Sequence, residues 1–136
     1  MYYIKEIIDY GVIGLLLIMS ILTVTLFFER LFYFKRVDIK EFKTKEVCEN
    51  RLSNNLTAIA TVASNAPYIG LLGTVLAIMQ TFIDMSQSSL AATKIMSSLA
   101  LALKTTAIGL VVAIIATVLY NILVRKIETK LVEYGS

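Results

Sequence analysis

Two threonines lie deep inside apolar segments of this chain of 136 residues, and they are the residues whose chemistry is most informative. Thr74 lies in ASNAPYIGLLGTVLAIM, residues 63–79, and Thr106 lies in LALKTTAIGLVVAIIATVLYN, residues 101–121. A hydroxyl both donates and accepts a hydrogen bond, so two neighbouring hydroxyls can solvate an ion or relay a proton. Hydroxyls do not titrate near neutral pH. A titratable group on such a path must therefore come from elsewhere.

The depths of the two threonines match. Asp84 and Lys94 are the natural outer boundary residues, and a rise of about 1.5 Å per residue puts Thr74 about 15 Å and Thr106 about 18 Å below them. A membrane-buried hydroxyl often bonds back to the carbonyl one turn earlier, and this ordinary role stays open for each threonine. Two hydroxyls at one depth on adjacent helices favour a polar ring near mid-membrane, with Thr105 as the third candidate for the same path.

Other chemistry finds little support in the sequence. The chain has no histidine, and its one cysteine, Cys48, has no partner for a disulfide or a metal site. We find no nucleophile and base pair and no phosphate-binding glycine loop, so we expect neither an enzyme nor a cofactor. No carboxylate is predicted at mid-depth, because all of those near the spans lie at or beyond the predicted membrane edges: Glu6, Asp9, Glu29, Asp84, Glu128 and Glu133.

Lys104 is the one charge predicted within a membrane span, and intramembrane charges are functional candidates by default. At 100° per residue, Lys104 lies about 160° around the helix from Thr106. The lysine should therefore point away from the threonine face. We expect it to reach toward the outer surface or to contact a neighbouring subunit.

The composition indicates what must position these residues. Hydrophobic residues make up 57% of the chain, charged residues only 17%, and the mean hydropathy is +0.76. Such a composition exceeds what a small soluble domain can cover with polar surface, so we predict an all-α integral membrane protein. The net charge of +3 comes from basic residues beside apolar runs, and membrane topology explains them better than nucleic-acid binding does.

Three transmembrane helices are predicted, at residues 11–28, 62–84 and 95–124. The third is longer than a span requires and should project beyond the membrane. Because basic residues are retained inside, the loop with a helix at 29–61 and the tail at 125–136 should be cytoplasmic. The N-terminal segment 1–10 and the link 85–94 should lie outside. The N-terminus carries both signs of charge with no cleavage site after it, which favours a retained anchor over a signal peptide.

Small residues form a stripe on each of the second and third helices, and in lipid such a stripe indicates close helix–helix contact. The first helix has no stripe and should face lipid. Three helices alone bury too little to use two stripes, so an oligomer is expected, although a compact three-helix bundle is the alternative that the stripes leave open. The predicted packing residues are Ala66, Gly70, Gly73, Ala77, Ala102, Gly109 and Ala113.

The two segments quoted above, above all YIGLLGTV and TTAIGL, resemble the paired core segments of the ExbB, TolQ and MotA proton-channel family, in a short form of the ExbB type. The resemblance implies a homopentamer in the bacterial inner membrane, with a periplasmic N-terminus, a cytoplasmic C-terminus, and the second and third helices around a central pore. Single helices of an ExbD-like partner would fill the pore and bring the missing aspartate. The complex would use the proton-motive force to drive a TonB-like protein in uptake across the outer membrane.

By the same resemblance, Thr74 and Thr106 fall on the pore-lining threonine positions of the family. The chain departs from the family at Leu101, where a glutamate is common, and at Lys104, where the family has an apolar residue. The role of that glutamate is therefore not carried over. Two alternatives remain at this point: a TolQ-like subunit of an envelope complex, and a structural scaffold that conducts nothing.

Overall fold

The computed structural model describes the backbone of residues 2–135 and the side chains of residues 6–135. Its elements are α1 (Tyr2–Arg36), the short 3-10 helix η1 (Ile39–Glu41), α2 (Lys45–Leu52), α3 (Leu56–Gln87) and α4 (Ala92–Gly135). No strand occurs in the described part, and three helices are long and apolar enough to cross a membrane. The all-α membrane fold is confirmed. The ends of the predicted segments 1–10 and 125–136, Met1 and Ser136, lie outside the described residues.

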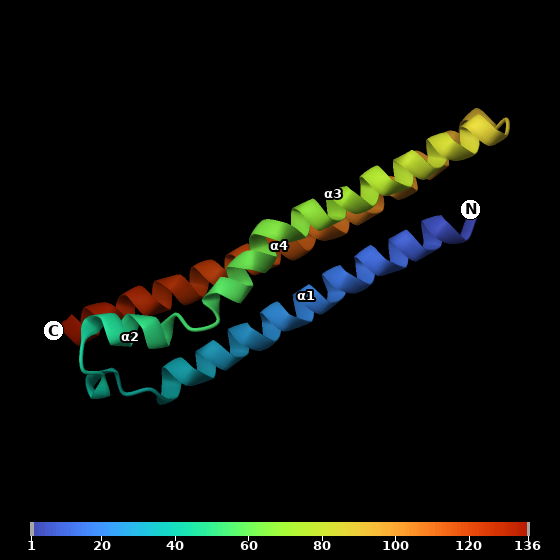
Figure 1. Cartoon of the computed structure of the whole chain (residues 1–136). Helices are drawn as coiled ribbons and strands as arrows, with labels where there is room; N and C mark the ends of the chain where they lie inside the picture. Colours follow the sequence, from blue (N-terminus) through green and yellow to red (C-terminus); the bar gives the residue numbers. More distant parts are fainter. Residues whose placement is uncertain (1, 136) are drawn as a thin grey trace.

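The three long helices extend beyond the predicted spans. α1 begins well before Gly11 and continues past Phe28, and α3 begins before residue 62. α4 continues beyond Val124 to Gly135. Figure 1 shows α3 and α4 side by side as an antiparallel hairpin, with α1 alongside and α2 near the C-terminal end of α4. The membrane boundaries 11–28, 62–84 and 95–124 stay predictions.

The small residues of α3 and α4 pack against each other inside one chain. Ala66 and Ala102 are buried, and a methyl group added at Gly70 would lie 2.5 Å from the carbonyl oxygen of Thr105. One added at Gly109 would lie 2.6 Å from the carbonyl oxygen of Ala66. Gly73, Ala77 and Ala113 are also buried. The facing helix of the same chain thus covers Gly70 and Gly109, as in the compact-bundle alternative, and Val12 of α1 lies beside Gly73.

The apolar run of α1 begins at the same level along the helices as the threonines of the hairpin. A methyl group added at Gly73 would lie 3.1 Å from Cγ1 of Val12, one residue inside the predicted outer end of the first span. Asp84 lies eleven residues farther along α3, about 16 Å at 1.5 Å per residue. The predicted outer ends of the first and second spans therefore do not lie at one level. If α1 marks the membrane surface, the hairpin projects outward beyond it.

Arg30 joins α1 to the end of α2 at the opposite end of the molecule. Its guanidinium is buried and donates to the carbonyl oxygens of Arg51 at 2.9 Å and Leu52 at 3.4 Å. Two further N–H groups donate to the Glu29 carboxylate at 2.6 Å each, and the guanidinium lies 4.3 Å from the centre of the Tyr33 ring. Carbonyl groups at the C-terminus of α2, which have no partner within the helix, are thus hydrogen-bonded by a cation, and a positive charge is also favourable at that end of a helix.

We expect Arg30→Leu to lower the free energy of unfolding by about 1.5–3 kcal/mol, the usual contribution of a hydrogen bond to a charged group. Arg30→Lys should recover only part, because an ammonium cannot reproduce the planar fork of the guanidinium. Denaturant unfolding of the purified protein in micelles, followed by circular dichroism, measures both. Arg125→Leu is the matched control, because the Arg125 side chain is 82% exposed. Equal losses in the two leucine variants would contradict the role of Arg30.

Cys48 lies in the apolar cluster at this end, with Leu52, Leu56, Ile59, Leu123 and Ile127, and its side chain is fully buried. Burial raises the pKa of the Cys48 thiol, because desolvation disfavours the thiolate. The thiolate is the reactive form, so we expect folded protein to be alkylated at pH 8 more slowly than unfolded protein by about 10-fold or more. A Lys45→Cys variant in a Cys48→Ala background supplies the exposed control. Equal rates for the two cysteines would contradict the burial.

Candidate functional site: a threonine cluster between α3 and α4

Three threonine hydroxyls meet around one backbone carbonyl in the middle of the hairpin. Thr74 Oγ1 lies 2.5 Å from Thr106 Oγ1 and 3.3 Å from Thr105 Oγ1. Thr105 Oγ1 lies 3.0 Å from the carbonyl oxygen of Gly70, and Thr74 Oγ1 lies 2.8 Å from that of Ala102. We expected Thr74 and Thr106 to lie at the same depth, and in the structure their hydroxyls are in direct contact. Gly70 makes this contact feasible, because it has no Cβ to hold the helices apart.

The distances assign the hydroxyl protons, since each hydroxyl has only one to donate. Thr74 donates to the Ala102 carbonyl, and Thr105 donates to the Gly70 carbonyl. Thr106 then donates to Thr74 Oγ1, because its other acceptor, the Gly70 carbonyl, is 3.4 Å away. Thr106 Oγ1 is left with acceptor capacity that no described hydroxyl uses. The ordinary back-bond of Thr74 to the Gly70 carbonyl, at 3.4 Å, is the longest of the four contacts that Thr74 Oγ1 makes.

The three threonines differ in exposure. Thr105 is completely buried and Thr74 is 5% exposed, whereas Thr106 is half-buried. Thr105 faces Gly73 on the side where α1 packs. Thr105, the third residue predicted for the proton path, has a side chain that is wholly buried among the helices. Of the three, Thr106 is the hydroxyl that another molecule can reach.

Thr106 lies on the side of the hairpin that faces away from α1. Leu16 of α1 packs with Val62 of α3 and with Val112 of α4. At 100° per residue, Val112 lies about 120° from Thr106 around α4, whereas Thr117 and Val124 lie within about 20° of it. We call the side that carries Thr106, Thr117 and Val124 the far face.

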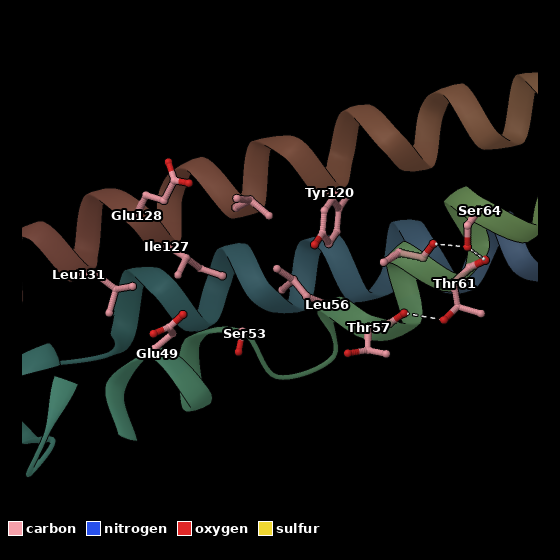
Figure 2. Close-up of a pocket in the computed structure, with 12 residues that line it drawn as sticks. Glu49, Ser53, Leu56, Thr57, Thr61, Ser64, Tyr120, Ile127, Glu128 and Leu131 are labelled. Atoms are coloured by element: carbon pink, nitrogen blue, oxygen red, sulfur yellow. Dashed lines mark hydrogen bonds between the residues drawn. The ribbon is translucent and has the colours of Figure 1, made fainter. Parts of the chain in front are cut away.

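The far face continues into a groove of about 460 Å³ toward the end of the hairpin that carries α2. Figure 2 shows Thr57, Thr61 and Ser64 of α3 opposite Tyr120 and Glu128 of α4, with Glu49 of α2 at the rim. Thr61 and Ser64 donate to the carbonyls of Thr57 and Ala60, at 2.7 and 3.0 Å, and Ser64 Oγ accepts from Asn65 Nδ2 at 3.3 Å, so each hydroxyl oxygen keeps a free lone pair. The groove can thus accept hydrogen bonds from water or from a cation.

Sequence reasoning missed this groove. Its signal was present, because Thr57, Thr61 and Ser64 follow helical spacing, but Thr57 and Thr61 lie before the second predicted span and Ser64 lies two residues inside it. Lys104 is exposed and lines a separate groove on the α1 side together with Glu6 and Asp9. Leu101 lines that groove too. Within the described residues, no three His, Cys, Asp or Glu side chains form a group that could hold a metal ion.

Comparison with known proteins agrees with this architecture. Residues 37–135 match the model of the MotA/TolQ/ExbB proton channel family. A biopolymer transport protein ExbB of Aquifex aeolicus is 51% identical over 132 residues, 96% of this chain and 89% of that protein. A putative ExbB-like protein of Helicobacter pylori is 50% identical over 91% of this chain and 83% of its own length.

A Tol-Pal system protein TolQ of Haemophilus influenzae is 42% identical, but over 62% of this chain and 38% of its own length. The three long apolar helices and the ExbB relatives identify a multi-pass protein of the inner membrane. The match to the family model covers well over half of the chain, and the ExbB relative covers nearly all of it. The chain therefore belongs to the MotA/TolQ/ExbB proton channel family.

Proposed function

We propose that this chain is the ExbB-type subunit of an inner-membrane complex that couples proton flow to mechanical work. The observation that carries the proposal is the half-buried Thr106 hydroxyl, whose open acceptor lies on the far face while its proton is held by Thr74. A proton on a partner's carboxyl beside Thr106 would find a hydrogen-bond acceptor there. The hydroxyls of the far-face groove continue in the same direction toward the α2 end.

The proposal gives the titratable group to a partner. The parts of α3 and α4 around Thr106, residues 60–80 and 101–121, contain no carboxylate, and Glu49 and Glu128 lie in the groove at the other end of the face. A single transmembrane helix with an aspartate, of the ExbD type, would supply the missing acid. Several copies of this chain, five by family resemblance, would surround that helix with their far faces inward. The N-terminus would then be periplasmic and the C-terminus cytoplasmic.

Proton flux in reconstituted vesicles tests the proposal. We expect flux under an imposed pH gradient when this chain is inserted together with its ExbD-like partner, and none above empty vesicles when it is inserted alone. Mass measurement of the detergent-extracted complex gives the copy number. A monomer with and without the partner, or a complex that conducts nothing, would favour the structural scaffold and overturn the proposal.

The client of the complex is proposed to be a TonB-like protein, which powers uptake across the outer membrane. The ExbB-type relatives of Aquifex aeolicus and Helicobacter pylori match 96% and 91% of this chain at 51% and 50% identity, whereas the TolQ relative matches 62% at 42% identity, and this difference favours TonB over Tol. Expression with its partner in strains lacking either endogenous system separates the two. Recovery of iron-chelate uptake is expected. Recovery of envelope integrity alone would assign the chain to the Tol system.

A further inference from the structure

Most of the polar groups that line the far-face groove can only accept hydrogen bonds. Ser53, Thr61 and Ser64 each donate the hydroxyl proton to a backbone carbonyl three or four residues earlier, at 3.4, 2.7 and 3.0 Å. Glu49 and Glu128 add carboxylates, which have no proton to donate when they are ionised. None of the described residues that line the groove is a lysine or an arginine, although the chain has 13 of them. The groove therefore favours a ligand that donates hydrogen bonds and carries a positive charge.

Glu128 has only a weak partner within the chain. Its Oε2 lies 3.9 Å from Nη1 of Arg125, and the two side chains are 61% and 82% exposed. An ion pair so long and so exposed contributes little. Lys126 and Lys130 are each two residues from Glu128, about 160° around α4, so they lie on the other side of the helix. The Glu128 carboxylate is thus available to a second molecule.

Glu49 is available too, because it makes no ion pair with any cation that the structure describes. Lys45 lies one turn earlier on the same face of α2 but does not line the groove. The first turn of α3, which begins at Leu56, does border it. A helix N-terminus carries roughly half an elementary positive charge, which offsets only part of the charge of two carboxylates. The groove as a whole remains negative.

The groove lies on the path of the partner helix proposed above. Val124 belongs to the far face together with Thr106 and also lines the groove. A helix that keeps its acid beside Thr106 therefore leads along the far face to the groove, and Glu128 is 22 residues farther along α4, about 33 Å. In the proposed orientation this end is cytoplasmic, where the flanks of single membrane helices are rich in lysine and arginine.

We propose, on the basis of the proposed function, that the far-face groove binds an arginine of the partner's chain, in the segment that flanks its membrane helix at the α2 end. The acceptors come from three elements, with Glu49 on α2, Thr61 on α3 and Glu128 on α4 (Figure 2). A guanidinium presents five donors in a planar fork and can bond to acceptors on several elements at once, whereas an ammonium is a compact charge with three. This contact holds the partner at the position along the far face that keeps its acid beside Thr106.

A labelled synthetic peptide with the sequence of the partner's flank tests the proposal. Its binding to the purified full chain in neutral detergent is measured by fluorescence anisotropy. We expect Glu49→Gln and Glu128→Gln each to weaken binding by about 10-fold, the equivalent of one charge-assisted hydrogen bond, and the double variant to weaken it further. Glu46→Gln is the matched control, because Glu46 is an exposed carboxylate of α2 that does not line the groove. Circular dichroism and mass measurement report whether each variant folds and assembles.

Peptide variants identify the donor. Replacement of the arginines by glutamine should abolish binding to the groove, and replacement by lysine should retain part of it. Unchanged binding in a folded double variant, or equal binding of the glutamine peptide, would overturn the proposal. A double variant that loses copies of this chain but binds the peptide as before would assign the groove to contact between subunits and overturn it too.

Proton flux through the complex in vesicles separates this contact from the proposed function. A complex that conducts while the flank peptide does not bind would overturn the arginine contact alone. A complex that conducts nothing, although the peptide binds with the expected dependence on both carboxylates, would overturn the proposed function and support the contact.

Discussion

Substitution of Gly109 by alanine is expected to force α3 and α4 apart. The added methyl group would lie 2.6 Å from the carbonyl oxygen of Ala66 and 3.0 Å from Cα of Gly70, and both are backbone atoms that no side-chain rotation can remove. Overpacking of this kind costs about 1–3 kcal/mol, and a valine at the same site should cost more. The separation would also break the threonine contacts one turn away. Loss of both stability and transport is therefore expected.

Thermal unfolding of the purified complex in micelles measures the first effect, and uptake in a complemented strain measures the second. Gly14→Ala is the matched control, because nothing lies within 4 Å of a methyl group added there in α1. Gly73→Ala should fall between the two, since its new methyl group meets the side chains of Thr105 and Val12 and not backbone. A Gly109→Ala complex as stable as Gly14→Ala would mean that the helices do not approach as closely as described.

The small-residue stripes show which part of the helix packing could be predicted from the sequence. The spacing of Gly70, Gly73 and Gly109 predicts two helix faces that demand close contact, and this physics is local to each helix. It does not specify the occupant of the contact. The sequence pattern of a stripe is the same whether a second subunit, a partner helix or the next helix of the same chain covers it. The contact itself was therefore predictable, whereas its occupant, the facing helix of the same chain at Gly70 and Gly109, was not.

Arg30 and the far-face groove escaped prediction for a different reason. Arg30 follows an apolar run and resembles an ordinary positive-inside marker, and only the fold brings the carbonyls of Arg51 and Leu52 to its guanidinium. The hydroxyls of Thr57 and Thr61 lie before the predicted second span, since polar residues lower local hydropathy even where a helix lines water. The depth of one helix relative to another could not be predicted from the sequence either. Hydropathy indicates where each apolar segment begins and ends, but it does not indicate which residues of two segments lie side by side.

Thr106→Val is expected to lower proton flux on the order of 100-fold, the lower range of what a positioned proton-transfer group contributes, while the complex still assembles. Valine matches threonine in shape but removes the acceptor on the far face. The hairpin should tolerate it, because Thr74 still donates to the Ala102 carbonyl and Thr105 still donates to the Gly70 carbonyl. Thr106→Ser keeps the hydroxyl and should retain most of the flux. Vesicle assays normalised to assembled complex make the comparison.

Thr105→Val is the matched control within the same cluster. It also removes one threonine hydroxyl, the one that donates to the Gly70 carbonyl, but from a fully buried position on the α1 side. Both valine variants lose about one intramembrane hydrogen bond, worth about 0.6 kcal/mol, so their stabilities should be similar. Only exposure to the far face separates them. A large loss of flux in Thr106→Val alone requires a role for the open acceptor, whereas equal losses would mean that the threonines only hold the two helices together.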